Sequence, residues 1–154
     1  MPGRWYGAEP SWRLPFERDA RRQYGPQLVA NETATTLTYR HRGIDVRGRP
    51  EPLAVTIRFQ ADPKYDTYGL APADYPRVFA DLGAESMHRM PGDDSLCLYY
   101  AADPVDRRWT ADKGLLTLLD LTADHLFFEE YWRSTGGNRA GIWLGPEAEH
   151  GVQR

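Results

Sequence analysis

Residues 53–59 alternate strictly between large apolar side chains and other side chains, and this pattern constrains the fold more than any other feature of the chain. The apolar side chains that share one face are Leu53, Val55, Ile57 and Phe59. A two-residue period of this kind is typical of a β-strand with one buried face. A second strand is predicted over residues 35–46, and the glycine and prolines of residues 47–52 predict a turn between the two. The sequence therefore predicts an antiparallel hairpin over residues 35–59.

Helices are predicted on both sides of this hairpin along the chain. The first spans residues 15–24, where Pro15 suits a first-turn position. The second and stronger helical pattern spans residues 111–132, with Thr110 as its expected N-cap. A short strand is expected around residues 77–82, after a stretch rich in proline, glycine and tyrosine. This order of helix, hairpin-built sheet, irregular segment and helix predicts an α+β fold.

Length and charge limit the class of protein. The chain has 154 residues, which fits one domain with its own core, and we expect a single domain over residues 1–154. A net charge of −3 argues against a nucleic-acid partner, which normally requires a basic surface. The sequence shows no secretory signal core and no stretch near the roughly 18 apolar residues that a membrane-spanning helix needs. We therefore expect a soluble cytoplasmic protein that does not bind membranes.

Cys97 is the only cysteine of the chain, which excludes an internal disulfide and a cysteine-rich zinc site. It lies between Leu96 and Leu98, after a turn-rich stretch at residues 88–93. A lone cysteine is most often an inert buried residue. The alternative is a nucleophile for acyl transfer, because the thiolate of cysteine is strongly nucleophilic. The sequence shows no metal-ligand cluster and no phosphate-binding glycine loop, so we expect neither a metal nor a cofactor.

The order of motifs around this cysteine resembles that of ubiquitin-conjugating enzymes. The motif Leu96-Cys97-Leu98 follows His88, and Trp109 opens the second predicted helix. The resemblance covers most of residues 12–132. It implies an N-terminal helix, a four-stranded antiparallel meander, a cysteine-bearing loop and a central helix packed across the sheet. It also implies that the cysteine accepts an activated acyl group as a thioester.

A narrower resemblance is to the stand-alone conjugating-enzyme-like proteins of bacterial defence operons, the short type II cyclic-oligonucleotide-based antiphage (CBASS) operons. It rests on the runs Leu96–Tyr100, Arg107–Trp109, Gly114–Leu116 and Tyr131–Arg133. It implies that the chain conjugates the C-terminus of a cyclic-dinucleotide-synthase-like nucleotidyltransferase to an acceptor protein or a small nucleophile. Because no ATP-binding element is visible, activation of that C-terminus requires a separate activating enzyme or a mechanism that the sequence does not reveal.

The chain departs from the family pattern because no asparagine lies between His88 and Cys97. In the family this asparagine is thought to stabilise the oxyanion of the tetrahedral intermediate, so the oxyanion donor of this chain is unidentified. His88 matches the histidine of the family's tripeptide and is expected either to shape the loop or to polarise the intermediate. His150 is expected either to be an exposed terminal residue or to fold back onto Cys97 as a general base or oxyanion donor.

Four residues that follow the cysteine are candidates for the acceptor side of the site. Asp103 and Asp106 are expected to orient an acceptor lysine, as acidic residues near the cysteine do in the family. Tyr99 is expected either to line the acceptor channel or to pack against the loop. Trp109 is expected to anchor the core beside the site.

Charged neighbours decide what fraction of a thiol is ionised. Asp93 and Asp94 are expected to oppose the thiolate if they lie close to Cys97. Arg107 and Arg108 are expected to favour it. The sequence does not rank these opposing effects.

Two other functions stay open. One is a non-catalytic adaptor of the same fold that binds the partner without chemistry, which the missing asparagine favours and the presence of Cys97 opposes. The other is a cysteine hydrolase of such conjugates, which requires a histidine and an aspartate oriented towards the thiol. Only His150 keeps the hydrolase open.

Overall fold

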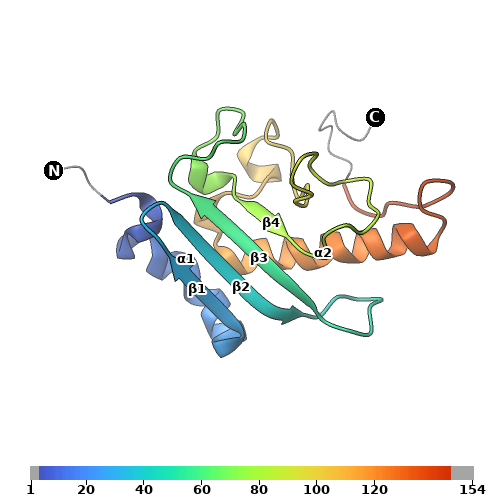
Figure 1. Ribbon diagram of the computed structural model, residues 1–154, viewed down its shortest axis with the longest axis horizontal. Coiled ribbons are helices and arrows are strands. Elements are labelled where there is room, and N and C mark those ends of the chain that lie inside the picture. Colours follow the sequence, from blue (N-terminus) through green and yellow to red (C-terminus); the bar gives the residue numbers. More distant parts are fainter. Residues whose placement is uncertain (1–3, 147–154) are drawn as a thin grey trace.

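The computed structural model describes residues 4–146 of the chain. Within this range it has two α-helices and one four-stranded antiparallel sheet, so the predicted α+β class is confirmed. The strands follow one another in the sheet as they do in the chain (Figure 1). In chain order the elements are α1 (Pro10–Tyr24), β1 (Leu28–Glu32), β2 (Thr36–Ile44), β3 (Leu53–Gln60), β4 (Arg77–Phe79) and α2 (Leu115–Ser134).

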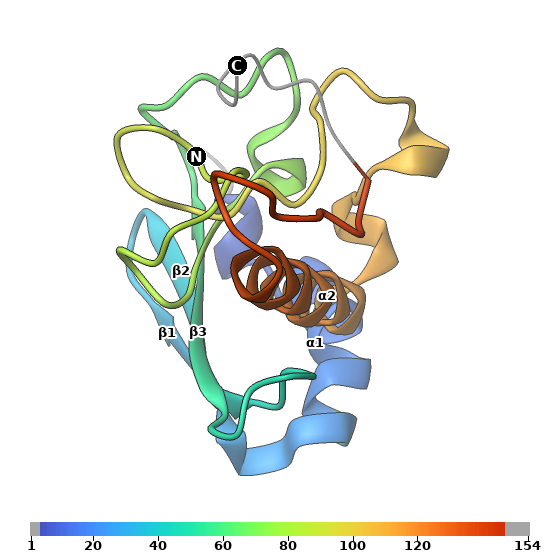
Figure 2. The same ribbon diagram turned by 90° about the vertical axis from the view of Figure 1, so that its right-hand side faces the viewer.

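Strand β3 has the alternation that its sequence predicts. Val55, Ile57 and Phe59 are each no more than 1% exposed and belong to the core. Both helices cover the same side of the sheet (Figure 2). Leu37 and Tyr39 of β2 lie opposite Phe59 and Ile57 in the antiparallel register. The predicted hairpin is therefore confirmed. Its apolar face forms the core against α1 and α2.

Helix α1 begins five residues earlier than predicted. Pro10 occupies the first turn, where its missing N–H has no intrahelical partner to lose, and Pro15 lies inside the helix. The prediction that Pro15 starts the helix was wrong because two prolines fit the same rule. Glu17 fixes α1 to the sheet, since it is buried and accepts hydrogen bonds from Arg13, Arg21 and the hydroxyl of Tyr39.

Helix α2 begins at Leu115, and the predicted start at residue 111 belongs to a separate 3₁₀ turn, Ala111–Lys113. Gly114 separates the two because its φ of 92° lies in the left-handed region. Thr110 therefore precedes the 3₁₀ turn and does not cap α2. The predicted short strand is confirmed as β4, but it ends at Phe79.

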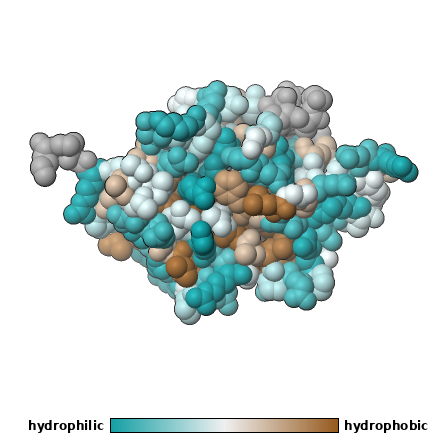
Figure 3. All heavy atoms as spheres, in the orientation of Figure 1, coloured by the Kyte–Doolittle hydropathy of each residue, from teal (hydrophilic) through white to brown (hydrophobic). Residues whose placement is uncertain are grey.

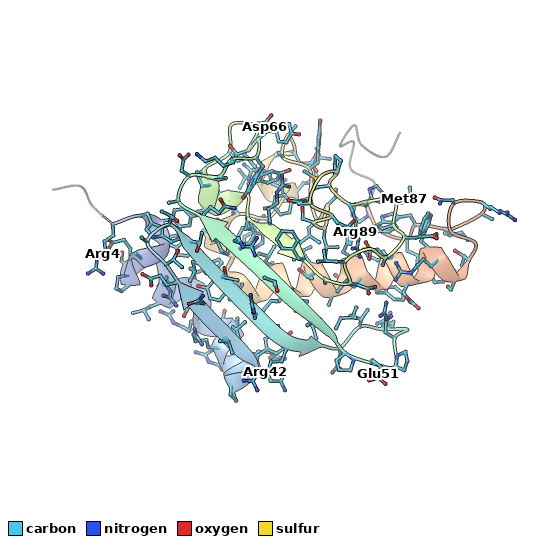
Figure 4. The ribbon with its side chains drawn as sticks, in the orientation of Figure 1. Arg4, Arg42, Glu51, Asp66, Met87 and Arg89 are labelled. Atoms are coloured by element: carbon cyan, nitrogen blue, oxygen red, sulfur yellow. The ribbon has the colours of Figure 1, made fainter. Side chains whose placement is uncertain are left out.

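Strand β1 was missed by the sequence analysis. Its burial follows no alternation, because Leu28 is the one buried residue in a strand of five. The face of the sheet opposite the helices is largely hydrophilic, with apolar residues gathered near its middle (Figure 3). Arg42 lies on this sheet far from the cysteine-bearing segment (Figure 4). No helix between residues 4 and 146 has the length and apolar character to cross a membrane.

Candidate active site

The cysteine-bearing segment is bound to the free edge of β4 through the backbone. Leu96 N donates to Val78 O at 2.9 Å, and Cys97 N donates to His88 O at 3.0 Å. Residues 88–97 therefore fold back on themselves beside the sheet. Main-chain hydrogen bonds to Val78 and to His88 therefore set the position of the thiol.

The thiol of Cys97 is covered in this structure. The residue is 8% exposed, and its Sγ donates to the Sδ of Met90 at 3.2 Å. Burial raises the pKa of the thiol to about 12, although Arg77 opposes this effect, and Asp93 and Glu129 reinforce it. A thiol with this pKa is protonated at neutral pH.

The cations that act on the thiol differ from those that the sequence predicts. Arg77 is the strongest favourable charge and Arg89 is a weaker one. Arg107 and Arg108 were expected in this role, but the fold instead brings Arg77 of β4 and Arg89 close enough to act on the thiol. Asp93 opposes the thiolate, as expected, whereas Asp94 is paired with Arg89 at 3.0 Å.

A groove of about 300 Å³ opens between Cys97 and helix α2, and we call it the α2-side groove. It brings together the thiol and all four candidates for the acceptor side, which lie up to twelve residues away in sequence. Its lining comprises Cys97, Leu98, Tyr99, Tyr100, Asp103, Asp106, Arg107, Arg108, Trp109, Lys113, Thr117, Leu121 and Pro146. The structure thus brings the four candidates and Cys97 to one groove.

The candidates differ in what they offer to the groove. Trp109 is 1% exposed and its indole donates to Gly114 O at 3.0 Å, so it is a core anchor as predicted. The hydroxyl of Tyr99 donates a hydrogen bond to the carbonyl oxygen of Asp74 at 2.7 Å, which favours a packing role. Asp103 and Asp106 form no ion pair with any residue between 4 and 146. These two carboxylates are therefore free to attract a cationic ligand.

A second groove, of about 270 Å³, lies on the other side of the cysteine segment, and we call it the β4-side groove. The sequence did not predict it, although Tyr68 and Tyr75 of the tyrosine-rich stretch contribute to it. The residues that line it are Asp66, Tyr68, Tyr75, Arg77, Met90, Pro91, Tyr100, Ala101 and Ala102. The label of Asp66 in Figure 4 marks its upper rim. Met90 belongs to this groove and also covers the thiol.

His88 is buried behind the cysteine segment. It is 2% exposed, and its ring centroid lies 4.5 Å from that of Trp143. Trp143 also packs against His125 and Phe128, at 5.2 and 5.7 Å between centroids. This arrangement favours the loop-shaping role of His88. His150 lies outside the described residues, which end at Pro146 on the lip of the α2-side groove.

A buried charge cluster, which sequence analysis missed, fixes the cysteine segment to α2. Arg89 makes two hydrogen bonds to Glu129, at 2.7 and 2.8 Å, and His125 Nε2 lies 3.2 Å from the same carboxylate. Arg89 also binds Asp81 O and Asp94 Oδ2. Arg89, labelled in Figure 4, lies on the cysteine-bearing segment. The sequence indicated this cluster only through a glutamate that follows a histidine by four residues on the apolar face of the helix.

The site contains a thiol and two carboxylates that line the α2-side groove, and the β4-side groove shares Tyr100 with it. Among residues 4–146, neither groove is lined by a histidine. A histidine–aspartate pair of the kind that a cysteine hydrolase needs is therefore not assembled at the thiol by the described residues.

Comparison with known proteins identifies no relative of the chain. No protein-family model, no curated protein and no solved structure matches it.

Proposed function

We propose that this protein is an acyl-transfer enzyme of the ubiquitin-conjugating type, which carries the C-terminus of a partner protein as a thioester on Cys97. The observation that carries the proposal is the α2-side groove, whose lining includes Cys97 together with Asp103 and Asp106. The element order supports it. An N-terminal helix, a four-stranded antiparallel meander, a cysteine-bearing segment and a second helix follow one another as in that family.

The first step is a thioester exchange. The Sγ of Cys97 forms a bond to the carbonyl carbon of an activated donor, and the bond from that carbon to the donor's leaving thiol breaks. The proton of Cys97 leaves with the departing thiolate, so the reaction needs neither oxidant nor hydrolysis. A high pKa of the free thiol is compatible with this step, because the donor acyl group is already activated.

The second step transfers the acyl group to an amine. A lysine ammonium attracted by Asp103 and Asp106 must lose a proton before its nitrogen can attack the thioester. A carboxylate in the groove can accept that proton. Attack then forms an amide, and the thiol of Cys97 is regenerated with a proton.

The donor that we propose is the C-terminus of a cyclic-dinucleotide-synthase-like nucleotidyltransferase in bacterial antiphage defence, and a separate enzyme supplies its activation. This assignment rests on the sequence resemblance of the runs around Cys97 and Trp109. A second candidate function is a non-catalytic adaptor on the same surface. The 8% exposure of Cys97 and its cover by Met90 favour the adaptor.

Intact-mass spectrometry under non-reducing conditions separates these functions. The protein is co-expressed with a cyclic-dinucleotide-synthase-like nucleotidyltransferase as wild type, as Cys97→Ser and as Cys97→Ala. The proposal predicts a reducible adduct on the wild type, a thiol-resistant ester on Cys97→Ser and no adduct on Cys97→Ala. A stable complex without any adduct would instead support the adaptor. If Cys97→Ala still formed conjugates, the proposed nucleophile would be wrong.

A further inference from the structure

Arg77, on strand β4, brings a guanidinium to the inner side of the cysteine segment. Arg77 and Cys97 both line a cavity of about 20 Å³ between β4 and that segment. A cavity of about 10–15 Å³ is enough to hold one water molecule. The space that the two residues share therefore accommodates one oxygen-sized group and no larger ligand.

The guanidinium of Arg77 is held in place and retains an unused donor. Its side chain is 12% exposed, stacks 3.9 Å above the ring of Tyr65 and pairs with Asp93 at 3.3 Å. The Nε atom is buried and makes no hydrogen bond of acceptable geometry to any residue between 4 and 146, although Asp93 is near it. Buried donors normally have an acceptor. Arg77 therefore combines a place in the cavity lining with a buried donor that the described residues leave without a hydrogen bond.

The effect of the Arg77 charge on the pKa of Cys97 agrees with the cavity that the two residues share. Burial is the main cause that raises the pKa of Cys97, and the charge of Arg77 is the strongest effect that opposes it. A cation that stabilises negative charge on Sγ also stabilises negative charge that develops on an adjacent oxygen.

The β4-side groove leads to this cavity, because both are lined by Tyr75, Arg77 and Met90. At its rim the ring of Tyr68 is 61% exposed, on a backbone with a φ of 52°. The carboxylate of Asp66 holds this conformation by accepting a hydrogen bond from Tyr68 N at 2.8 Å. Rigid tyrosine rings supply large contact areas for a peptide at a low entropic cost. The groove thus has the surface and the direction to lead an extended peptide to the thiol.

We infer that the β4-side groove receives the extended C-terminal tail of the acyl donor, and that Arg77 donates a hydrogen bond to the oxygen of the carbonyl group whose carbon Cys97 attacks. This inference rests on the proposed function and supplies the oxyanion donor for which the sequence has no asparagine. As the bond from Sγ to carbon forms, the carbonyl electron pair moves to the oxygen beside Arg77. When the carbonyl forms again, the bond to the leaving thiol breaks, and that sulfur takes the proton of Cys97.

The test uses a synthetic peptide thioester that carries the C-terminal sequence of the partner nucleotidyltransferase, so no activating enzyme is needed. Single-turnover acylation of Cys97 is followed by intact mass. At saturating peptide, Arg77→Gln is expected to lower the rate by ~10²–10³-fold, the effect of losing one oxyanion donor. Arg77→Lys is expected to recover part of this rate because it keeps the charge. Tyr68→Ala is expected to raise the half-saturating peptide concentration and leave the saturated rate unchanged.

Arg58→Gln is the matched control. Arg58 lies opposite Arg77 in the β3–β4 register and stacks on Phe79 at 5.3 Å, but it lines neither the cavity nor the groove. Its acylation rate should equal that of the wild type. Wild-type acylation by a folded Arg77→Gln variant, with no adduct on Cys97→Ala, would overturn the inference and leave the proposed function standing. The absence of any adduct on the wild type would overturn both.

Discussion

The Sδ of Met90 accepts the Sγ–H of Cys97 at 3.2 Å, so a flexible thioether side chain covers the only thiol of the protein. Met90 also lines the β4-side groove. Its main-chain N–H is held by Ser95 O at 2.7 Å, which fixes its backbone and leaves its side chain to move. A ligand in that groove therefore contacts the residue that controls access to the thiol.

Met90→Ala should increase the rate at which iodoacetamide alkylates Cys97. We expect the rate to rise roughly tenfold, which corresponds to about 1.4 kcal/mol less free energy for local opening. The rate is measured by mass spectrometry at constant pH. Met87→Ala is the control, since Met87 lines neither of the two grooves. Equal rates for Met90→Ala and the wild type would show that Met90 does not limit access.

The pH dependence of alkylation should report the raised pKa of Cys97. Burial raises this pKa to about 12, so the thiolate fraction of the folded protein keeps increasing with pH well above the range of a free thiol. An unfolded cysteine ionises near about pH 8.5, and its alkylation rate levels off above that value. We expect the folded protein to show no plateau up to pH ~10. A plateau near that of the denatured protein would contradict the buried state of the thiol.

Glu129→Gln should destabilise the fold strongly. Glu129 is fully buried and receives both hydrogen bonds of the Arg89 fork, so the variant removes the buried anion of Arg89 and leaves it only the more exposed carboxylate of Asp94. We expect the free energy of unfolding to fall by about 3–5 kcal/mol. Glu130→Gln is the matched control on the same helix. Its partners Arg49 and Arg133 are partly exposed, and its effect should stay below about 1 kcal/mol in urea titrations.

Acid should weaken the same cluster in a defined window. Burial alone raises the pKa of Glu129, but hydrogen bonds from Arg89 and His125 outweigh it and lower the pKa to about 2. The unfolded glutamate ionises near about pH 4.3, so the native ion pairs stabilise the protein fully above about pH 5. This stabilisation, about 3 kcal/mol, is lost as the pH falls from about 4.3 towards 2. Urea titrations at several pH values should show this loss in the wild type and not in Glu129→Gln.

Asp103→Asn combined with Asp106→Asn should slow the second chemical step alone. Transfer of the acyl group from Cys97 to free lysine is expected to fall by ~10²-fold, the lower end of the range for general-base catalysis. Formation of the thioester should not change. Asp124→Asn, on the exposed face of α2, is the control. Equal loss of both steps in the double variant would indicate damage to the loop and contradict a role in deprotonating the amine.

The elements that the sequence predicted are those with strong local patterns. The alternation of residues 53–59 and the apolar face of residues 115–126 survive in the structure because each buries one face against the other. Strand β1 carries no such pattern, since pairing with β2 decides its conformation. The predicted starts of both helices were wrong. In α1 both Pro10 and Pro15 fit a first-turn position, and in α2 the left-handed Gly114 separates the 3₁₀ turn from the helix.

The candidate site was predicted where it is local and missed where it is not. Cys97, Asp103, Asp106 and Trp109 lie close in sequence and share one groove. The pairing of Arg89 with Glu129 spans 40 residues. Arg77 and Cys97 line one cavity but belong to separate elements. Neither this arrangement nor the pairing of Arg89 with Glu129 was visible without the fold. Arg107 and Arg108, which are near in sequence, are not the cations that act most strongly on the thiol.

The hydrogen bond from Leu96 to Val78 has a consequence beyond the position of the thiol. A strand at the edge of a sheet presents unpaired backbone groups that can join a strand of another molecule, which is a common origin of aggregation. The cysteine-bearing segment occupies part of that edge along β4. A substitution that loosens this segment would therefore have two effects. It would displace the thiol, and it would expose a strand edge that can pair with neighbouring molecules. Solubility during expression is thus linked to the integrity of the site.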